Sequence, residues 1–215
     1  MNRTVSFSGG KHGFECPADM EEHIRRVFQG EYDVPIEFEH PPSVLDIGAN
    51  VGAFCVWAAC RWNTERITCY EPHPTNFEML KRNILKRSHE VKLIQAAVVG
   101  SLGETTMELH PGLHNLGESS LLDLGEQDMT ISFKVDTIQA CNLESADIVK
   151  IDTEGMEIPI LSHLDLSQTT ALLVEWHSAA DRRVIDASMT SLNTFELVGG
   201  ETYGPTRGTM KFVRK

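Results

Sequence analysis

The stretch VLDIGANVG, residues 44–52, decides the fold that this sequence predicts. An apolar run that contains Asp46 leads into a turn through Gly48, Asn50 and Gly52. Apolar residues with helical spacing follow directly after the turn. A short buried strand, a glycine-containing turn and a helix in this order are typical of α/β folds that bind nucleotide-like cofactors.

The same alternation continues along the chain. Strands are expected at residues 43–47, 66–71, 91–99, 147–152 and 171–176, and helices at 52–60 and 74–87. Short apolar strands that alternate with helices predict a parallel sheet covered by helices on both faces. Residues 100–130 interrupt the alternation, and a further strand is expected at 131–135. Two strands around a Gly/Pro turn within 195–215 predict an antiparallel C-terminal hairpin.

The bulk properties indicate one globular domain. The chain has 215 residues, of which 41% are hydrophobic and 23% charged, enough to bury a full core without disulfides or metals. Residues 1–42 are interpreted as a leader packed onto a domain that spans 43–215. The first residues lack the apolar core of a signal peptide, and no apolar run approaches the length of a membrane span.

The charge and the cysteine pattern argue against several classes of partner. A net charge of −12 argues against a large basic groove, so nucleic acid is not the expected substrate. Five cysteines without CxxC spacing argue against a disulfide framework or a zinc site and fit a reducing cytoplasm. The histidines of HPGLH, residues 110–114, belong to a Pro-Gly turn, so no metal ligand set is assigned.

Acidic residues follow the predicted strands. Because the carboxyl ends of parallel strands meet at one edge of a sheet, we expect these side chains to lie close together there. The five acids are Asp46, Glu71, Asp152, Glu154 and Glu175. Such a cluster is costly unless a cation or several hydrogen-bond donors lie among the acids, so it indicates a cationic cofactor or a metal.

Two cofactors compete for the turn. A dinucleotide fingerprint can be laid on Gly48, Asn50 and Ala53, with Glu71 about 20 residues further on as the ribose-binding acid. However, Asn50 stands where a glycine would let a pyrophosphate approach the backbone, and Asp46 would repel phosphate. A cationic nucleoside fits better, because S-adenosylmethionine can place its ammonium and ribose hydroxyls against the acids and its carboxylate against backbone N–H groups of the turn. S-adenosylmethionine is therefore the expected cofactor.

Three motifs in order give a more specific indication. They are D-x-G-A-N-x-G at residues 46–52, Glu71-Pro72 with a following Asn76-Phe77, and K-I-D-x-E-G-x-E at 150–157. Over about residues 43–178 the sequence resembles the FkbM family of S-adenosylmethionine-dependent methyltransferases. The resemblance implies a Rossmann-like class I methyltransferase fold, with a seven-stranded, mostly parallel sheet and a reversed C-terminal hairpin.

The resemblance also implies an activity and a set of cofactor-binding residues. The expected reaction is transfer of a methyl group, most often to a hydroxyl oxygen of a small metabolite, sugar or lipid-like acceptor. Gln95 and Ala96 are expected to edge the adenine. The remaining expected cofactor contacts are Asp46, Gly48, Asn50, Gly52, Glu71, Pro72 and Asn76.

Three side chains are the candidate catalytic groups. Asp152 is expected to orient substrate or face the cofactor, and Glu154 to orient the acceptor or act as a base. His177, which follows the fifth predicted strand, is a second candidate base because an ordinary histidine titrates near neutral pH. The alternatives are that the two acids cap a helix that starts near Met156, and that His177 is only a structural hydrogen-bonding group.

The acceptor itself is not named by the sequence. His114, Asn115 and Ser119 lie on a polar loop that is expected to contact a small-molecule acceptor. A methyltransferase of the same fold that acts on nitrogen or carbon, and a non-catalytic nucleotide-binding or interaction module, remain the rival interpretations. A homodimer is left open, as is a divalent ion between Asp152 and Glu154.

Overall fold

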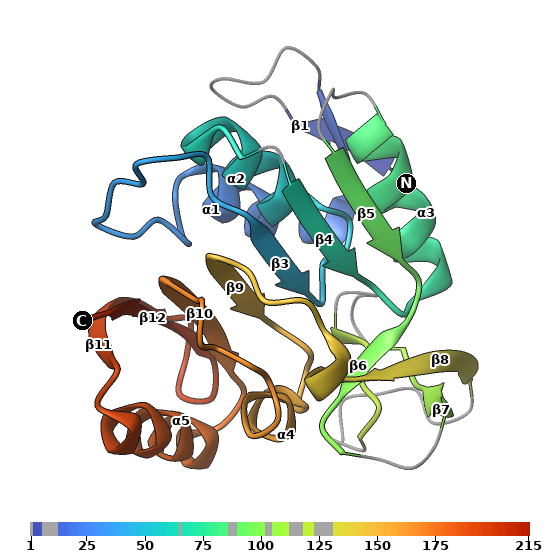
Figure 1. Cartoon of the computed structure of the whole chain (residues 1–215). Helices are drawn as coiled ribbons and strands as arrows, with labels where there is room; N and C mark the ends of the chain where they lie inside the picture. Colours follow the sequence, from blue (N-terminus) through green and yellow to red (C-terminus); the bar gives the residue numbers. More distant parts are fainter. Residues whose placement is uncertain are drawn as a thin grey trace.

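A central seven-stranded sheet organises the computed structural model, which describes residues 2–5, 13–64, 66–85, 90–101, 105–111, 118–122 and 131–215 (Figure 1). The strand order is β11-β12-β10-β9-β3-β4-β5. The strands are β3 (Val44–Ile47), β4 (Arg66–Tyr70), β5 (Glu90–Ile94), β9 (Ile148–Ile151), β10 (Ala171–Trp176), β11 (Phe195–Thr202) and β12 (Gly208–Arg214). Only β12 runs against its neighbours, which confirms the predicted sheet and its antiparallel C-terminal hairpin.

Helices cover both faces of the sheet. One core joins the sheet to α1 (Glu21–Phe28), α2 (Ala53–Trp62) and α3 (Pro74–Leu85), and the other joins it to α4 (Glu157–Leu161) and α5 (Ala179–Leu192). The alternation within β10 divides its residues between them, since Ala171 and Leu173 pack into the first core and Leu172 and Val174 into the second. No helix among the described residues is long and apolar enough to cross a membrane.

The strand expected at residues 91–99 is two strands in two different sheets. The chain leaves the main sheet after β5, and β6 (Ala97–Val99) joins a three-stranded sheet of order β6-β8-β7. In that sheet β8 (Phe133–Gln139) pairs parallel to β6 and antiparallel to β7 (Thr106–Leu109). The apolar run alone could not reveal this break, because both halves of the run bury side chains against a sheet.

The N-terminal segment packs on the first core. β1 (Asn2–Val5) pairs antiparallel with β2 (Phe14–Pro17), and a 3-10 turn, η1 (Ala18–Met20), leads into α1. Two edge-to-face ring contacts join the connection after α1 to α2, Tyr32 with Phe54 at 5.2 Å and Phe38 with Trp62 at 6.1 Å between centroids. This packing places α1 beside the carboxyl edge of the sheet, where the acidic residues gather.

Candidate active site

The turn after β3 is fixed by contacts with both neighbouring strands. Gly48 has φ +80°, and a Cβ there would lie 1.7 Å from the carbonyl oxygen of Asp152, so only glycine fits. The N–H groups of Gly48 and Ala49 donate to the carbonyl oxygen of Tyr70, at 3.0 and 2.9 Å. The N–H of Asn50 donates to Glu71 Oε2 at 2.8 Å. The N–H groups of Gly48, Ala49 and Asn50 therefore already have acceptors within the chain, and contact of a cofactor carboxylate with N–H groups at the helix start stays a prediction.

Gly52 serves packing, and the structure does not place it on the cofactor cavity. It has φ +92°, and a Cβ there would lie 2.6 Å from Leu80 Cδ1 on α3. The glycine therefore lets the start of α2 approach α3 closely. A direct cofactor contact at Gly52 stays a prediction.

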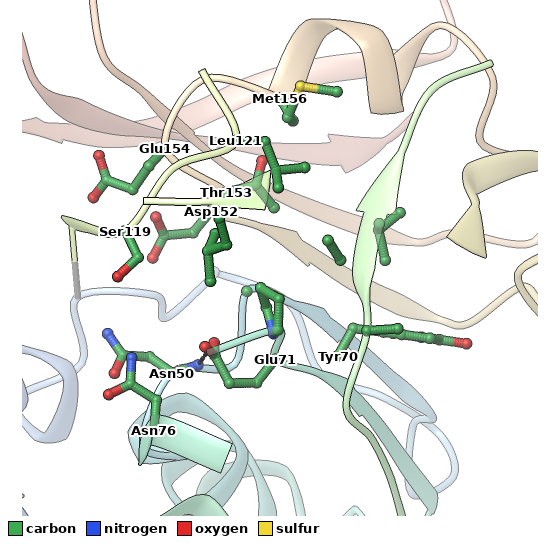
Figure 2. Close-up of a pocket in the computed structure, with 16 residues that line it drawn as sticks. Asn50, Tyr70, Glu71, Asn76, Ser119, Leu121, Asp152, Thr153, Glu154 and Met156 are labelled. Carbon is green, nitrogen blue, oxygen red and sulfur yellow. Dashed lines mark hydrogen bonds between the residues drawn. The ribbon is translucent and has the colours of Figure 1, made fainter. Parts of the chain in front are cut away.

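A cavity of about 560 Å³ opens at the carboxyl edge of β3, β4 and β9 (Figure 2). Its polar side is formed by Asn50, Glu71, Asn76, Ser119, Asp152, Thr153 and Glu154. Its apolar side is formed by Tyr70, Pro72, Ala96, Ala97, Val98, Leu109, Leu121 and Met156, and Gly48 completes the lining. In Figure 2, Asp152, Glu154 and Ser119 lie on one side, with Asn50 and Asn76 opposite. An apolar wall with a few convergent polar groups is typical of a small-molecule site.

Most of the residues predicted for a cofactor meet in this cavity, with two exceptions besides Gly52. Gln95 is exposed and does not line the cavity, because the chain turns away from the main sheet at that point, and its neighbour Ala96 does. Asp46 is fully buried behind the cavity. His114 and Asn115 lie outside the described residues, whereas Ser119 of the same predicted loop lines the cavity.

Glu71 presents a buried carboxyl group to the cavity. Its Oε2 accepts from the N–H of Asn50 and its Oε1 from the N–H of His73, each at 2.8 Å. Burial raises the pKa of Glu71 to about 7, and the two backbone hydrogen bonds oppose the rise. Each oxygen keeps a second lone pair, so the group can still accept hydrogen bonds from a ligand.

Lys150 on β9 is the cation among the acids. Its Nζ lies 3.1 Å from Asp46 Oδ1 and 3.4 Å from Asp152 Oδ2, and it donates to the carbonyl oxygen of Gly48 at 2.8 Å. Although burial lowers the pKa of Lys150, these carboxylates raise it above its ordinary value, so the ammonium stays charged. The expectation that Asp46 meets a cofactor ammonium is therefore corrected, because a protein ammonium already occupies its carboxylate.

Asp152 and Glu175 are hydrogen-bonded to each other at the end of β9 and β10. Burial and the Asp152 charge raise the pKa of Glu175, whereas Lys150 and the hydrogen bond from Glu175 hold that of Asp152 below its ordinary value against the effect of burial. These two acids and His177 bring one ligand atom each within 4.8 Å of one another, and the Lys150 ammonium lies 3.4 Å from Asp152 Oδ2 beside them.

His177 lies between two glutamates. Its Nε2 is 3.0 Å from Glu154 Oε2 and its Nδ1 is 3.5 Å from Glu157 Oε1. Burial lowers the pKa of His177, but the contacts with Glu154 and Glu157 outweigh it and raise the pKa to about 12. The ring nitrogens meet the carboxylates as ion pairs without hydrogen-bond alignment. This raised pKa favours a protonated His177 near neutral pH and argues against the predicted role as a general base.

The turn that carries Glu154 is shaped by a residue that the site prediction missed. Glu154 has φ +51°, uncommon for a residue with a side chain. Glu157 holds the turn, because its Oε1 accepts from the N–H of Thr153 at 2.7 Å and its Oε2 from the N–H of Gly155 at 3.0 Å. The sequence could have indicated this role, because Glu157 is the last glutamate of the K-I-D-x-E-G-x-E motif and lies at the first position of α4, where acids are favoured.

A second cavity of about 820 Å³ adjoins the first and shares Asn50, Asp152 and Glu154 with it. Its remaining lining comes from the start of α1, from β10, from the segment at 118 and from the turn between β11 and β12. These residues are Asp19, Met20, His23, Arg26, Glu118, Glu175, Tyr203 and Arg207. The shared carboxylates thus stand between an apolar-walled cavity and a polar one.

The sequence matches the family described as "Methyltransferase FkbM domain" over residues 46–197. The chain belongs to this FkbM methyltransferase family. The matched FkbM domain contains all five acids at the carboxyl edge of the sheet and confirms the resemblance that the three motifs carry.

Curated relatives of this FkbM chain are named methyltransferases at low identity. The hexuronic acid methyltransferase AglP of Haloferax volcanii is 25% identical over 169 residues, which cover 74% of this chain and 69% of AglP. The methyltransferase sdnD of Sordaria araneosa is 23% identical over 157 residues, which cover 58% of this chain. The chain spans only 61% of the length of sdnD.

Solved structures similar to the FkbM chain share its class I methyltransferase fold. A putative methyltransferase, yhhF of Escherichia coli, superposes with a TM-score of 0.57 at 13% identity and covers 99% of each chain. The tRNA (uracil-54, C5)-methyltransferase of Pyrococcus abyssi, solved with S-adenosyl-L-homocysteine, gives a TM-score of 0.55 at 10% identity, over 99% of this chain and 44% of that one. At these identities the likeness shows the fold alone.

Proposed function

We propose that this FkbM domain uses S-adenosylmethionine to methylate a hydroxyl oxygen of a small-molecule acceptor. The observation that carries the proposal is the pair of adjoining cavities that share Asn50, Asp152 and Glu154. Methyl transfer is an in-line displacement, so donor and acceptor must approach one point from opposite sides. Two cavities that meet at shared polar side chains supply such an arrangement.

The first cavity has hydrogen-bond acceptors and an apolar wall that suit S-adenosylmethionine. Glu71 can accept hydrogen bonds from the ribose hydroxyls, and Ala96, Leu121 and Met156 belong to the apolar wall suited to the adenine. Asn50 Oδ1 is buried without a hydrogen-bond partner and offers an acceptor to the cofactor. When bound, the cofactor supplies an electrophilic methyl group on its sulfonium.

Glu154 is the proposed base. It lies at the junction of the two cavities, where the new C–O bond forms as the S–C bond breaks, and it takes the proton that the acceptor hydroxyl loses. Burial raises the pKa of Glu154 above its ordinary value and outweighs the lowering by the His177 cation, so the carboxylate is more basic than a solvated one. Asp152, which lines both cavities, orients the acceptor.

The choice of oxygen and of a small acceptor has support from two sides. A carboxylate base serves an alcohol, whose proton must leave, and the relative AglP is named for a hexuronic acid, which carries hydroxyl groups. O-methylation gives a methyl ether, which ether-cleaving reagents remove. N- or C-methylation gives a methyl group on nitrogen or carbon, which these reagents leave in place. Mass spectrometry and NMR of the product therefore separate the three reactions.

The cofactor assignment is tested by calorimetry with S-adenosylmethionine and with NAD. Binding of S-adenosylmethionine alone is expected, and binding of NAD alone would remove the proposal.

The variant Glu154→Gln is expected to lower turnover on the order of 10²–10⁴-fold and to leave the affinity for S-adenosylmethionine within about twofold. Unchanged turnover would show that Glu154 is not the base, and bound cofactor without turnover in the wild-type chain would favour a binding module.

A further inference from the structure

We infer that the second cavity is the acceptor site and that it takes a polyhydroxylated, sugar-like molecule. This inference rests on the proposed function and names the acceptor class that goes with it. The space that water-sized groups can occupy in this cavity is about 300 Å³, the lower end of the range of about 300–1,000 Å³ typical of small-molecule sites. It reaches the methyl-transfer point through Asn50, Asp152 and Glu154, so a hydroxyl of an occupant can lie against the proposed base.

The outer wall of the acceptor cavity is assembled from the two ends of the chain. The hydroxyl of Tyr203, in the turn between β11 and β12, donates to Glu31, just after α1. Lys211 Nζ donates to the carbonyl oxygen of Glu31 at 2.9 Å. The guanidinium of Arg26 lies 4.8 Å from the centre of the Tyr203 ring. The N-terminal helix and the C-terminal hairpin are thus joined across the cavity, and its wall is preformed.

The groups on this wall are polar and suited to hydroxyls. Arg26 Nη2 lies 3.3 Å from His23 Nδ1, and burial lowers the pKa of His23 to about 4, so its ring is neutral. A neutral His23 that accepts from Arg26 through Nδ1 carries its proton on Nε2, where it can donate to a ligand. Arg26 Nε is buried without a hydrogen-bond partner and lies 3.9 Å from Glu31 Oε2, as a long ion pair. An apolar occupant would leave these groups desolvated and unsatisfied, whereas hydroxyls both donate and accept.

The chemistry of the two cavities differs accordingly. The first cavity has an apolar wall that includes Val98, Leu109 and Leu121. In the second cavity, Met20 is the single aliphatic side chain among the described residues that line it. A lipid-like acceptor would need the reverse arrangement, with an extended apolar wall beyond the transfer point. The polar lining therefore selects a sugar-like acceptor from the classes that the sequence left open.

The wall also lies outside the part of the chain that the family match covers. The match spans residues 46–197, which include the shared Asn50, Asp152 and Glu154 but neither Arg26 on α1 nor Tyr203 in the hairpin turn. The matched domain thus contains the proposed transfer point, and the outer wall of the acceptor cavity comes from segments on either side of that domain. Arg26, His23 and Tyr203 are the positions that we expect to set acceptor specificity.

The test compares acceptors and wall variants in one assay of S-adenosylhomocysteine formation. The acceptors are para-nitrophenyl glucoside, para-nitrophenyl glucuronide and 1-octanol. Turnover of at least one glycoside and none of octanol is expected. Turnover of octanol alone, or of none of the three by a chain that binds S-adenosylmethionine, overturns the inference about the acceptor.

The variants Arg26→Met and Tyr203→Leu are expected to raise KM for the glycoside about tenfold or more, the cost of one lost hydrogen-bonding group. Their affinity for S-adenosylmethionine by calorimetry is expected to stay within about twofold, because neither side chain lines the first cavity. Arg25→Met is the matched control, since Arg25 on the same helix is exposed and pairs with Glu21. Equal KM values for the Arg26 and Arg25 variants would overturn the wall assignment. If the wild-type chain does not bind S-adenosylmethionine, the proposed function itself is overturned.

Discussion

The carboxyl group of Glu71 lines the cofactor cavity, and burial raises its pKa to about 7. Only the ionised group accepts hydrogen bonds from both ribose hydroxyls, so a bound nucleoside favours the charged form. Affinity for S-adenosylmethionine is therefore expected to be full above about pH 8 and to fall by up to about tenfold towards pH 6, as the raised pKa is crossed.

Calorimetry at the two pH values measures this change. The variant Glu71→Gln serves as the reference, because it keeps the shape of the side chain and removes its titration. Its affinity is expected to be lower than that of the wild type at the higher pH and to change less between the two. The same pH dependence in both chains would show that another group, such as the ligand's own amine, is responsible.

His177 is expected to act through Glu154 and not as a base. Because its pKa is raised to about 12, it keeps its proton over the working range and contributes no change of rate there. Turnover should be lost as the pH falls through the raised pKa of Glu154, since the base must be ionised. His177→Gln removes the neighbouring cation, so it should move this loss to higher pH and lower turnover on the order of 10- to 100-fold.

The pH–rate profiles of the wild type and the variant provide the measurement. His163→Gln is the control, because His163 is exposed and contacts the carbonyl oxygen of Pro159. A wild-type profile with a step near pH 6.5 that the His177 variant lacks would restore His177 as the base.

At the scale of elements, strand and helix order followed from hydrophobic periodicity, and the strand-end acids followed from the parallel topology. Periodicity could not predict which buried side chain contacts which, or which strand pairs with which. Asp46 alternates into the core and meets Lys150, one strand away, across 104 residues of sequence. The departure of the chain after β5 depends on β8, a strand that comes later in the sequence and pairs with β6. Both features are tertiary, so no local pattern carries them.

Gly52 offers a test of packing between elements. Gly52→Ala would place a Cβ at φ +92° and 2.6 Å from Leu80 Cδ1, so it is expected to lower the free energy of unfolding by about 1–3 kcal/mol. Urea unfolding followed by tryptophan fluorescence measures the change. Gly199→Ala is the control, expected within about 0.5 kcal/mol, because its nearest new neighbour is the flexible end of Lys211.

The same variant separates packing from cofactor contact. Since Gly52 does not line the first cavity, the folded fraction of Gly52→Ala is expected to bind S-adenosylmethionine with an affinity within about twofold of the wild type. Unchanged stability with a large loss of cofactor affinity would return Gly52 to the contact set that the motif suggested.

At the scale of the whole molecule, the two ends of the chain close over a family domain that would otherwise leave the transfer point open on one side. α1 and the β11–β12 turn are far apart in sequence but are joined through Glu31 and Tyr203. The family domain thus holds the groups proposed for methyl transfer, and the flanking segments hold those proposed for the acceptor. We therefore expect substitutions in these flanking segments to change the acceptor that is used.

Net charge bears on whether RNA can be the acceptor. Nucleic-acid binding gains most of its affinity when lysine and arginine neutralise phosphates, and this chain has a net charge of −12 with carboxylates around the second cavity. Fluorescence anisotropy with labelled tRNA is expected to give a Kd weaker than about 10⁻⁴ M even at low salt, and tRNA should not support S-adenosylhomocysteine formation. Binding that strengthens steeply as salt is lowered, together with turnover, would replace the sugar-like acceptor with RNA. Binding without turnover would show only a basic surface patch outside the two cavities.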